Sequence, residues 1–342
     1  MSVPAKVLGV GASTPFGLDA RQTAMFVRAA KLVPRRDPLV ERADVEAGTA
    51  RAVRLADELL AVDRMLAFAS EAAEEALTQA EVALGPPLAV FVALPEATRA
   101  YTDEQADKLR SREFLDELER RLGRPIDRVR SEAVRLGHAG FAILLERALA
   151  QLSHGPVLVG GADSFHDPAC LASLAEQRRL LCESIHDGYI PSEGAAFVVL
   201  GPPSTDRSAI ARIVGVASGL EPEKTVEEPR IAELATELIR RVGSSLGSSP
   251  LPWVLPDVNG ERHRVKEWSF ACLRNKKLID IDRTREERLC QEAGELGAAT
   301  GAVYSAFVIE AFVTGFAPAS SALIVLASDG DERAVLALEA AS

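Results

Sequence analysis

The chain contains one long pattern twice: an apolar helical segment, a polar loop, an apolar strand segment and a turn. The first copy is HAGFAILLERALAQL at 138–152 followed by GPVLVGGADS at 155–164, and the second is GAVYSAFVIEAFVTGF at 301–316 followed by ALIVLASDG at 322–330. A helix that is apolar around most of its circumference is a buried helix. Continuous β-branched runs are typical of strands covered on both faces. The chain must therefore bury two helices between covered sheets.

Two further pairs of segments match each other. KVLGVGAST at 6–14 is similar to ARIVGVASG at 211–219, and PLAVFVALPE at 87–96 is similar to PLPWVLPDVNG at 250–260. Strands that alternate with helices indicate βαβ units with right-handed crossovers and a parallel or mixed sheet. The pairs predict an α/β fold made of two similar halves with the sheets around the central helices.

The two predicted halves are 1–205 and 206–342, packed as one compact unit, because the Pro- and Ser-rich stretch 201–209 reads as a turn between strands. Apolar residues with helical spacing predict a helix over 63–84. The charge-rich segment 102–122 is predicted to be an exposed helix or flap. The strongly charged segment 262–287 is predicted to be an irregular surface excursion.

Three glycines near the start of the chain, Gly9, Gly11 and Gly17, have the wrong spacing for a nucleotide-binding loop. We interpret them as residues of tight strand turns. We expect no cofactor and no metal.

Charge argues against several partners. The formal net charge of −11 argues against binding of nucleic acid or of an anionic membrane, because both are negatively charged. A local basic patch remains compatible with this total, and Arg35, Arg36, Arg110 and Arg112 are its candidates. Charges exposed on solvated faces are the more common explanation of such residues.

The cysteines and the N-terminus indicate a cytoplasmic protein. Cys170, Cys182, Cys272 and Cys290 lie far apart without CxxC spacing, which is typical of free thiols rather than of a disulfide framework. The N-terminus lacks the layout of a signal peptide. The stretch 298–317 approaches the length of a membrane span, but it contains a glutamate and a strand follows it, so we expect a buried helix and no membrane span.

Four segments, in this order, resemble the β-ketoacyl synthases, the condensing enzymes of fatty-acid and polyketide synthesis. They are VLGVGASTPFGLDARQTAMFVRAAK at 7–31, VLVGGADS at 157–164, DGYIPSEGAAFVVL at 187–200 and GELGAATGA at 294–302. The third match is the most specific, and together they extend over nearly the whole chain. The resemblance implies a duplicated thiolase-like fold with αβαβα layers and two buried central helices.

The resemblance also implies where catalytic groups would lie. The synthases use a cysteine at the start of the central helix, where the helix dipole lowers its pKa, two histidines that stabilise an enolate, and a supporting lysine. In this chain the cysteine position falls on Gly137, the histidines on Glu261 and Glu295, and the lysine on Cys290. Glycine has no nucleophile, and two ionised carboxylates would repel an enolate. We therefore expect decarboxylative condensation to be lost.

Two more family features differ. Ser192 stands at the first glycine of the family's GEGAA motif, and the hairpin that supplies an oxyanion donor is replaced by 327–332. Each lost donor is typically worth about 10²–10³-fold in rate. These changes add to the argument against condensation.

Several candidate residues keep two interpretations. His138 could be a repurposed base or nucleophile, or it could cap or pack at the start of the helix. His263 lies two residues beyond the expected histidine, so a shift in register could restore one imidazole. Cys290 could be a reactive thiol, but a buried inert thiol is more common.

Glu261 and Glu295 form a separate question. They could face each other across the former pocket and divide acid and base roles, as paired carboxylates do when burial separates their pKa values. They could instead bind a cation, or accept hydrogen bonds from Asn259 and His263.

For function, two classes stay open. The first is a degenerate β-ketoacyl synthase-like protein, inactive in condensation, with a structural or partner-binding role. Its expected partners are a second copy of itself or a ketosynthase-like protein, with an acyl carrier protein as a further candidate. The resemblance implies a homodimer joined edge to edge near 157–161. The alternative is an acyltransferase or thioesterase-like enzyme that uses a remodelled pocket on acyl-ACP or acyl-CoA. An open tunnel to Gly137 favours the enzyme, and a filled pocket favours the structural role.

Overall fold

The structure is a computed structural model that describes residues 4–29, 32, 34–36, 39–40, 47–83, 85–202, 204–221 and 231–341. Within these residues ten strands form one mixed sheet in the order β10-β9-β11-β12-β8-β1-β7-β6-β4-β5. The strands are β1 Ala5–Ser13, β4 Ala89–Leu94, β5 Glu132–Arg135, β6 Val157–Ser164, β7 Glu193–Gly201, β8 Ala211–Leu220, β9 Trp253–Pro256, β10 Arg285–Glu286, β11 Ser321–Ala327 and β12 Glu332–Ala340. A separate short pair consists of β2 Arg35–Arg36 and β3 Gly48–Thr49.

The sheet repeats one arrangement. Strands β5-β4-β6-β7-β1 form one side and β10-β9-β11-β12-β8 the other, so each half places its third, second, fourth, fifth and first strand side by side. The matching sequence segments occupy equivalent positions in the two halves. Segments 6–14 and 211–219 form β1 and β8, and segments 87–96 and 250–260 contain β4 and β9. The two halves join where Ala5, Lys6 and Val7 of β1 pair with β8. The predicted duplication is therefore confirmed.

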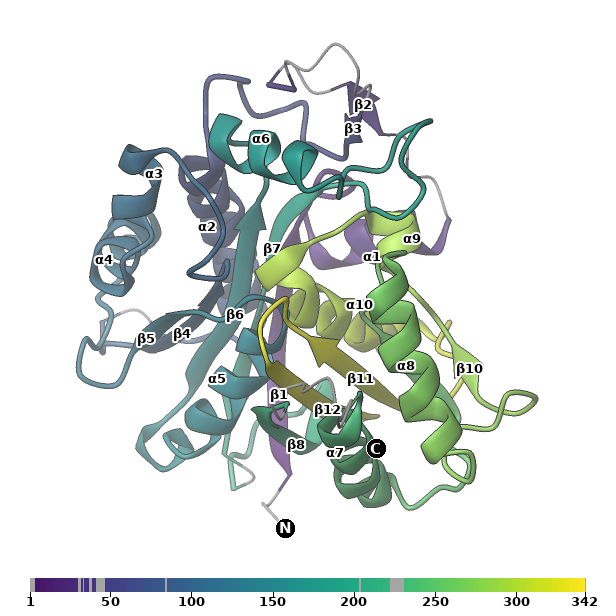
Figure 1. Ribbon diagram of the computed structural model, residues 1–342. Coiled ribbons are helices and arrows are strands. Elements are labelled where there is room, and N and C mark those ends of the chain that lie inside the picture. Colours follow the sequence, from purple (N-terminus) through teal and green to yellow (C-terminus); the bar gives the residue numbers. More distant parts are fainter. Residues whose placement is uncertain are drawn as a thin grey trace.

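Helices complete five layers (Figure 1). Helices α5 Gly140–Leu149 and α10 Thr300–Thr314 lie between the two halves of the sheet and share one apolar core with the inner faces of the strands. Helices α2 Ala61–Gln79 and α4 Ser111–Leu122 cover the outer face of the first half. Helices α7 Glu233–Gly243 and α8 Arg262–Arg274 cover the second half. The predicted α/β fold with αβαβα layers is confirmed.

Four shorter helices complete the chain. They are α1 Ala20–Arg28, α3 Asp103–Lys108, α6 Pro168–Glu176 and α9 Cys290–Ala293.

Gly9 and Gly11 lie inside β1 and not in turns, which corrects the prediction from their spacing. A Cβ on Gly9 would lie 2.2 Å from the carbonyl oxygen of Ala76, and one on Gly11 would lie 2.1 Å from that of Ala72. Both carbonyls belong to α2. The two glycines therefore let this helix pack directly against the backbone of β1, and only Gly17 lies in a turn.

Two predictions about charged segments change. Segment 262–287 begins with the regular helix α8, whose Trp268 and Ala271 are buried. Segment 102–122 forms α3 and α4, and α4 buries Phe114, Leu115 and Leu118 in the core that it shares with α2. Helix α4 is therefore part of the outer layer and not a flap over a pocket.

The strand predicted to join two protomers is an interior strand. Strand β6 pairs with β4 on one side and with β7 on the other, so it has no free edge. The outermost strand of this half is β5, which pairs with β4. The N–H of Ala133 in β5 donates a hydrogen bond to Ser111 Oγ, at 3.0 Å, at the start of α4.

Helix α10 is a core helix. Together with the turn before it, Gly297–Thr314 is the one segment among the described residues with the length and hydropathy of a membrane span. Within the structure 83% of this segment is buried. The predicted boundary between residues 205 and 206 lies in the connection from β7 to β8, and the division there stays a prediction.

Candidate functional site

Both central helices begin in the same unusual way. A short 3₁₀ turn precedes each one, Gly137–Ala139 before α5 and Gly297–Ala299 before α10. Both turns open on a glycine with a positive φ, +62° at Gly137 and +53° at Gly297. Only glycine adopts this conformation without strain, so both residues are determined by the backbone. The two turns contact each other at the centre of the molecule.

Each helix start is capped by a side chain from the opposite half. Asp163, at the end of β6, accepts a hydrogen bond from the N–H of Ala298 at 2.7 Å. Ser328, after β11, accepts one from the N–H of Ala139 at 3.0 Å. Free N–H groups at helix starts are the usual place for a bound anion or an oxyanion. Here these two donors are already satisfied within the protein.

The carboxylate of Glu96 occupies the space beside Gly137. A Cβ built on Gly137 would lie 1.7 Å from Glu96 Oε1, so a side chain at this position requires Glu96 to move. Glu96 is held in place by Arg99, whose Nη2 lies 3.1 Å from Glu96 Oε2 and whose Nη1 lies 2.6 Å from Asp163 Oδ1. The place where the resemblance puts a nucleophile therefore contains an anion bound to a half-buried guanidinium.

His138 lies between two carboxylates. Its Nε2 is 2.6 Å from Glu295 Oε1, and its Nδ1 is 3.6 Å from Glu96 Oε1. Burial alone would lower the pKa of His138, but Glu295 and Glu96 raise it to about 10. Burial alone would raise the pKa of Glu295, but His138 lowers it to about 2. His138 is thus a buried imidazolium at neutral pH and has no free lone pair with which to act as a base.

Glu295 and Glu261 are brought together by Asn259, as one interpretation of the sequence expected. Asn259 Nδ2 donates to Glu295 Oε2 at 2.6 Å and to Glu261 Oε2 at 3.2 Å. Glu261 also accepts two hydrogen bonds from Arg179, at 2.7 and 2.8 Å. Both carboxylates are therefore neutralised by cations rather than poised as an acid and a base.

Arg264 pairs with two further carboxylates. Its Nη2 lies 2.7 Å from Asp329 Oδ1 and its Nη1 lies 3.6 Å from Asp257 Oδ2. Arg179 also reaches Asp329, at 2.7 Å. Burial raises the pKa of Asp257, while Arg179 and Arg264 overcome burial and hold the pKa of Asp329 well below its usual range.

The charged residues around the helix starts form one connected set, which we call the central ion cluster. Adjacent members lie within ion-pair distance or share Asn259 as a bridge. Its six carboxylates and four cations are Glu96, Asp163, Asp257, Glu261, Glu295, Asp329, Arg99, His138, Arg179 and Arg264. Breaking a pair between its buried members, such as His138 and Glu295, leaves an uncompensated buried charge.

No protein-family model matches the sequence, and no curated protein matches it. Solved structures do match. This chain is similar to a chain in the structure of AntDE:AntF, a type II PKS acyl-carrier protein in complex with its ketosynthase bound to the hexaketide. The match covers 100% of both chains, with 15% sequence identity and a TM-score of 0.77.

Two further ketosynthases agree. The ishigamide ketosynthase/chain length factor matches over 99% of both chains at 16% identity and a TM-score of 0.71. The ketosynthase from module 6 of the bacillaene synthase of Bacillus subtilis 168 matches 99% of this chain and 72% of its own, at 13% identity and a TM-score of 0.76. The chain has the ketosynthase fold.

Two other candidates of the ketosynthase resemblance lie apart from any reactive arrangement. Cys290 is buried, its Sγ lies 3.1 Å from Tyr304 Oη, and burial raises the pKa of its thiol well above the usual value. His263 is exposed on α8. All four cysteines are free. Among the described residues no group of three or more His, Cys, Asp or Glu side chains is arranged to hold a metal ion.

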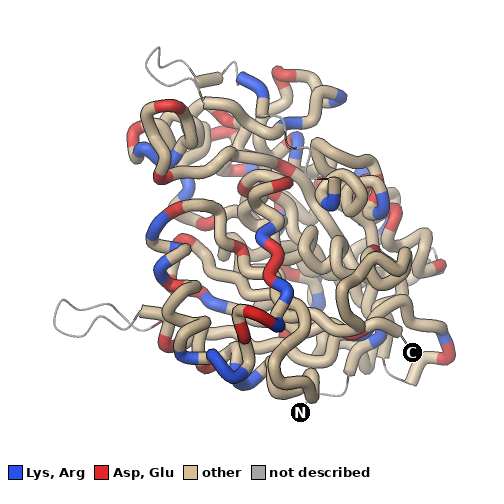
Figure 2. Tube along the Cα trace, turned by 90° about the vertical axis from the view of Figure 1, so that its right-hand side faces the viewer, with Lys and Arg blue, Asp and Glu red and all other residues tan. Residues whose placement is uncertain are grey.

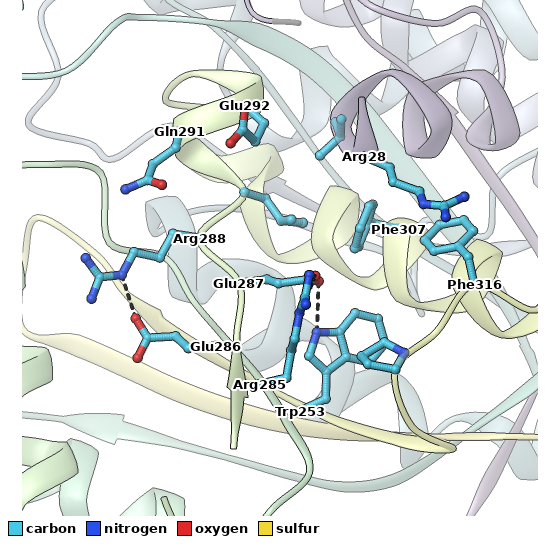
Figure 3. Close-up of a pocket in the computed structure, with 13 residues that line it drawn as sticks. Arg28, Trp253, Arg285, Glu286, Glu287, Arg288, Gln291, Glu292, Phe307 and Phe316 are labelled. Carbon is cyan, nitrogen blue, oxygen red and sulfur yellow. Dashed lines mark hydrogen bonds and ion pairs between the residues drawn. The ribbon is translucent and has the colours of Figure 1, made fainter. Parts of the chain in front are cut away.

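Two large cavities among the described residues lie away from Gly137. One of about 410 Å³ opens between α1, α9, α10 and the strands β9 and β10, with Arg28 and Phe316 at one end and Trp253 at its floor (Figure 3). Another of about 760 Å³ lies between α5, α7 and β8. Neither is lined by Gly137 or His138, and both of these residues are buried.

Several members of the central ion cluster were not singled out from the sequence, among them Glu96 and Asp257. One signal could have found this pair. In the matching segments VALPE and VLPD, each strand ends in proline and a carboxylate. Equivalent strand ends meet at the centre of a duplicated fold. No local pattern identifies Arg99 or Arg179, because their partners are distant in sequence.

Proposed function

We propose that this chain is a ketosynthase homologue without condensing activity that acts as a structural or partner-binding protein. The observation that carries the proposal is the contact between Gly137 and Glu96. Condensation needs a thiolate at the start of α5, and an anion held by Arg99 fills that space instead.

The surrounding chemistry supports the same conclusion. Neutral imidazoles that donate hydrogen bonds to an enolate are replaced by carboxylates, and His138 carries a positive charge that Glu295 compensates. The helix N–H groups of Ala139 and Ala298 are already bonded to Ser328 and Asp163. A thioester carbonyl would therefore find neither a nucleophile nor these two donors.

A partner role includes association with a second ketosynthase-like chain. We propose that this chain forms a homodimer, or a heterodimer with a ketosynthase-like protein, through the outer strand β5. The structures that it resembles include a ketosynthase with its acyl-carrier protein and a ketosynthase/chain length factor. An acyl carrier protein is a further candidate partner, and the cytoplasm is the proposed location.

The test is a direct search for acyl chemistry. The protein is incubated with acyl-carrier and acyl-CoA thioesters, and intact-protein mass is measured while free thiol and product release are followed. We expect no covalent adduct and no thioester consumption above the rate in buffer.

Two variants test whether any thioester consumption that is observed comes from this site. Thioester consumption that persists in the wild type and is lost in His138→Ala or Glu295→Gln would establish a repurposed acyl enzyme and overturn the proposal. Because both substitutions disturb buried charges, each variant is first checked for a native circular dichroism spectrum. Glu332→Gln, which changes a half-buried carboxylate at the first residue of β12, is the control for loss of a negative charge.

A further inference from the structure

The cavity between α1, α9, α10 and the strands β9 and β10 has the size of a small-molecule site. Its volume of about 410 Å³ lies within the range of about 300–1,000 Å³ that is typical of ligand pockets. It also lies where the two halves of the molecule meet, because α1 belongs to the first half and the other four elements belong to the second. Places where folded units meet are preferred sites for ligands.

Two carboxylates in the wall of this cavity are bound within the protein (Figure 3). Glu287 accepts a hydrogen bond from Trp253 Nε1 at 2.9 Å and two from Arg285, at 2.7 and 3.0 Å. Glu286 accepts a hydrogen bond from Arg288 Nε at 2.5 Å. These two arginines and two glutamates therefore neutralise one another, and this part of the wall carries no net charge.

Arg28 is a cation of the cavity that is stacked but not paired. Its guanidinium carbon lies 4.7 Å from the ring centre of Phe316, which packs edge to face on Phe307 with ring centres 5.7 Å apart. Four other guanidinium groups among the described residues stack on aromatic rings, and each of those also binds a carboxylate or a backbone carbonyl. Only the stacked side chain of Arg28, within the same residues, has no such partner. Its N–H groups are thus oriented and available for a planar carboxylate.

Glu292 is an anion of the same cavity without a cationic partner. It is half-buried in α9, and its carboxylate forms no hydrogen bond or ion pair with any residue that the structure describes. Figure 3 shows Glu292 and Arg28 entering the view from α9 and α1, both above Trp253. A half-buried carboxylate has lost part of its hydration without gaining a counter-charge, and a bound cation would compensate that loss.

The charges of the cavity have to be considered one by one, because the molecule offers no broad surface of one sign. Figure 2 shows Lys and Arg segments interspersed with Asp and Glu segments over most of the trace. The cavity is lined by three arginines and three glutamates, and two of each are paired with one another. One cation and one anion remain, beside the apolar side chains of Val27, Leu289 and Phe316.

We propose that this cavity binds a small zwitterion with an apolar side chain, of the amino-acid or dipeptide class. The carboxylate of the ligand pairs with Arg28, its ammonium group pairs with Glu292, and its side chain packs against Phe316. A simple anion or a simple amine would compensate one of these two residues and leave the other without a partner. The site lies away from Gly137, so the proposal does not depend on the absence of condensing activity.

The probes are L-phenylalanine and glycyl-L-phenylalanine, titrated into the full chain and followed by calorimetry. The analogues 3-phenylpropionate and 2-phenylethylamine keep the ring but lack the ammonium group and the carboxylate, respectively. We expect saturable binding of at least one zwitterion, and a Kd about tenfold higher or more for both analogues, because each loses a charge-assisted hydrogen bond. In the ¹⁵N-tryptophan NMR spectrum the indole signal of Trp253 should move more than that of Trp268, which does not line the cavity.

A pair of variants tests the location of the site. Arg28→Gln/Glu292→Gln should raise Kd for the zwitterion about tenfold or more. The matched variant Arg178→Gln/Glu176→Gln makes the same exchange at two exposed residues at the end of α6 and should leave Kd unchanged. Neither variant alters the net charge of the chain. All four side chains are exposed or half-buried, so thermal unfolding of both variants should match that of the wild type.

Three results would overturn the proposal. The first is the absence of saturable binding of either zwitterion. The second is an analogue that binds as tightly as the zwitterions, which would assign the cavity to a simple anion or amine. The third is an equal loss of binding in the two variants, or a larger shift of Trp268 than of Trp253, which would place the site elsewhere. If Arg28→Gln/Glu292→Gln did not fold, the four ligands and the two indole signals of the wild type would still decide.

Discussion

His138 is the residue on which the central ion cluster depends most. It is the only cation within reach of Glu295 Oε1, at 2.6 Å, among the ion pairs of the described residues. Removing it leaves a buried carboxylate without its counter-charge. We expect His138→Leu to lower the free energy of unfolding by about 3–5 kcal/mol, measured by urea denaturation.

The double variant His138→Leu/Glu295→Gln is the control for this prediction. It removes both charges, while the glutamine oxygen can still accept the N–H of Gly297 as Glu295 does. It should therefore be clearly more stable than His138→Leu. Equal stability of the two variants would contradict an electrostatic origin.

The charge on His138 also predicts a pH dependence. Its pKa in the folded protein, about 10, lies above the ordinary value of 6.5, so its contribution to stability is complete below pH 6.5 and disappears as the pH rises through 10. The pKa of Glu295 is lowered from 4.5 to about 2, so its contribution is present above pH 4.5 and disappears as the pH falls through 2.

The measurement is an NMR titration of ¹³C-labelled histidine. Of the five histidines in the chain, the signal absent from His138→Leu should stay that of an imidazolium between about pH 6 and pH 9. A midpoint near that of an exposed histidine would show that the ion pair with Glu295 is absent in solution.

The contact between Gly137 and Glu96 can be tested apart from backbone strain. Gly137 and Gly123 have similar positive φ values, +62° and +58°, but a Cβ on Gly123 would meet nothing within 4 Å. Alanine at either position suffers the same strain, and only Gly137→Ala also displaces Glu96. We expect Gly137→Ala to be less stable than Gly123→Ala by about 2 kcal/mol or more in urea unfolding. Similar losses would mean that Glu96 moves away at little cost.

At the residue scale, the sequence predicted which positions lie together but not their charge states. It identified Gly137, His138, Glu261 and Glu295 as neighbours of one site, because the resemblance aligned them with a known pocket. It could not assign their state, because Glu96 determines it, and Glu96 is 42 positions from His138 along the printed sequence. Ion pairs between distant positions leave no local pattern.

At the scale of elements, the backbone of helix α2 lies directly against the backbone of strand β1. A Cβ on Gly11 would lie 2.1 Å from a backbone oxygen of α2, which cannot rotate away as a side chain can. We expect Gly11→Ala to lower the free energy of unfolding by about 3 kcal/mol or more, measured by urea denaturation.

Gly219 in β8 is the matched position for that substitution. A Cβ there would lie 3.3 Å from the end of the flexible side chain of Leu234, so Gly219→Ala should cost less than about 1 kcal/mol. If the two variants were equally stable, the helix would have room to shift away from β1.

Most elements followed from the sequence because their apolar residues are continuous or regularly spaced. The strands β1, β8, β4 and β9 were recognised as matching pairs for this reason. Helix α8 was missed because charged residues face inward. Arg264 and Glu267 are buried, and Glu267 accepts a hydrogen bond from Arg333 at 2.5 Å. Buried charges hide the apolar face that identifies a helix.

At the scale of the whole molecule, the proposed association through β5 makes a specific prediction. The N–H of Ala133 donates to Ser111 Oγ and not to β4, so Ala133→Pro removes no hydrogen bond of the sheet, although it removes this bond, which an added strand would have to displace. Proline is tolerated on such an edge but prevents another strand from adding there. Sedimentation should give a dimer for the wild type and a monomer for Ala133→Pro. A dimer that survives the substitution would assign the interface to another surface.

The exchange of helix caps between the halves has a consequence for folding. Asp163 serves the helix of the second half and Ser328 serves the helix of the first. A half synthesised alone would lack the partner of the N–H group at the start of its central helix and would expose the apolar surface that this helix buries against the other half. We therefore expect the two halves to become stable together, so that separately expressed fragments split between β7 and β8 become protease-resistant only when they are mixed.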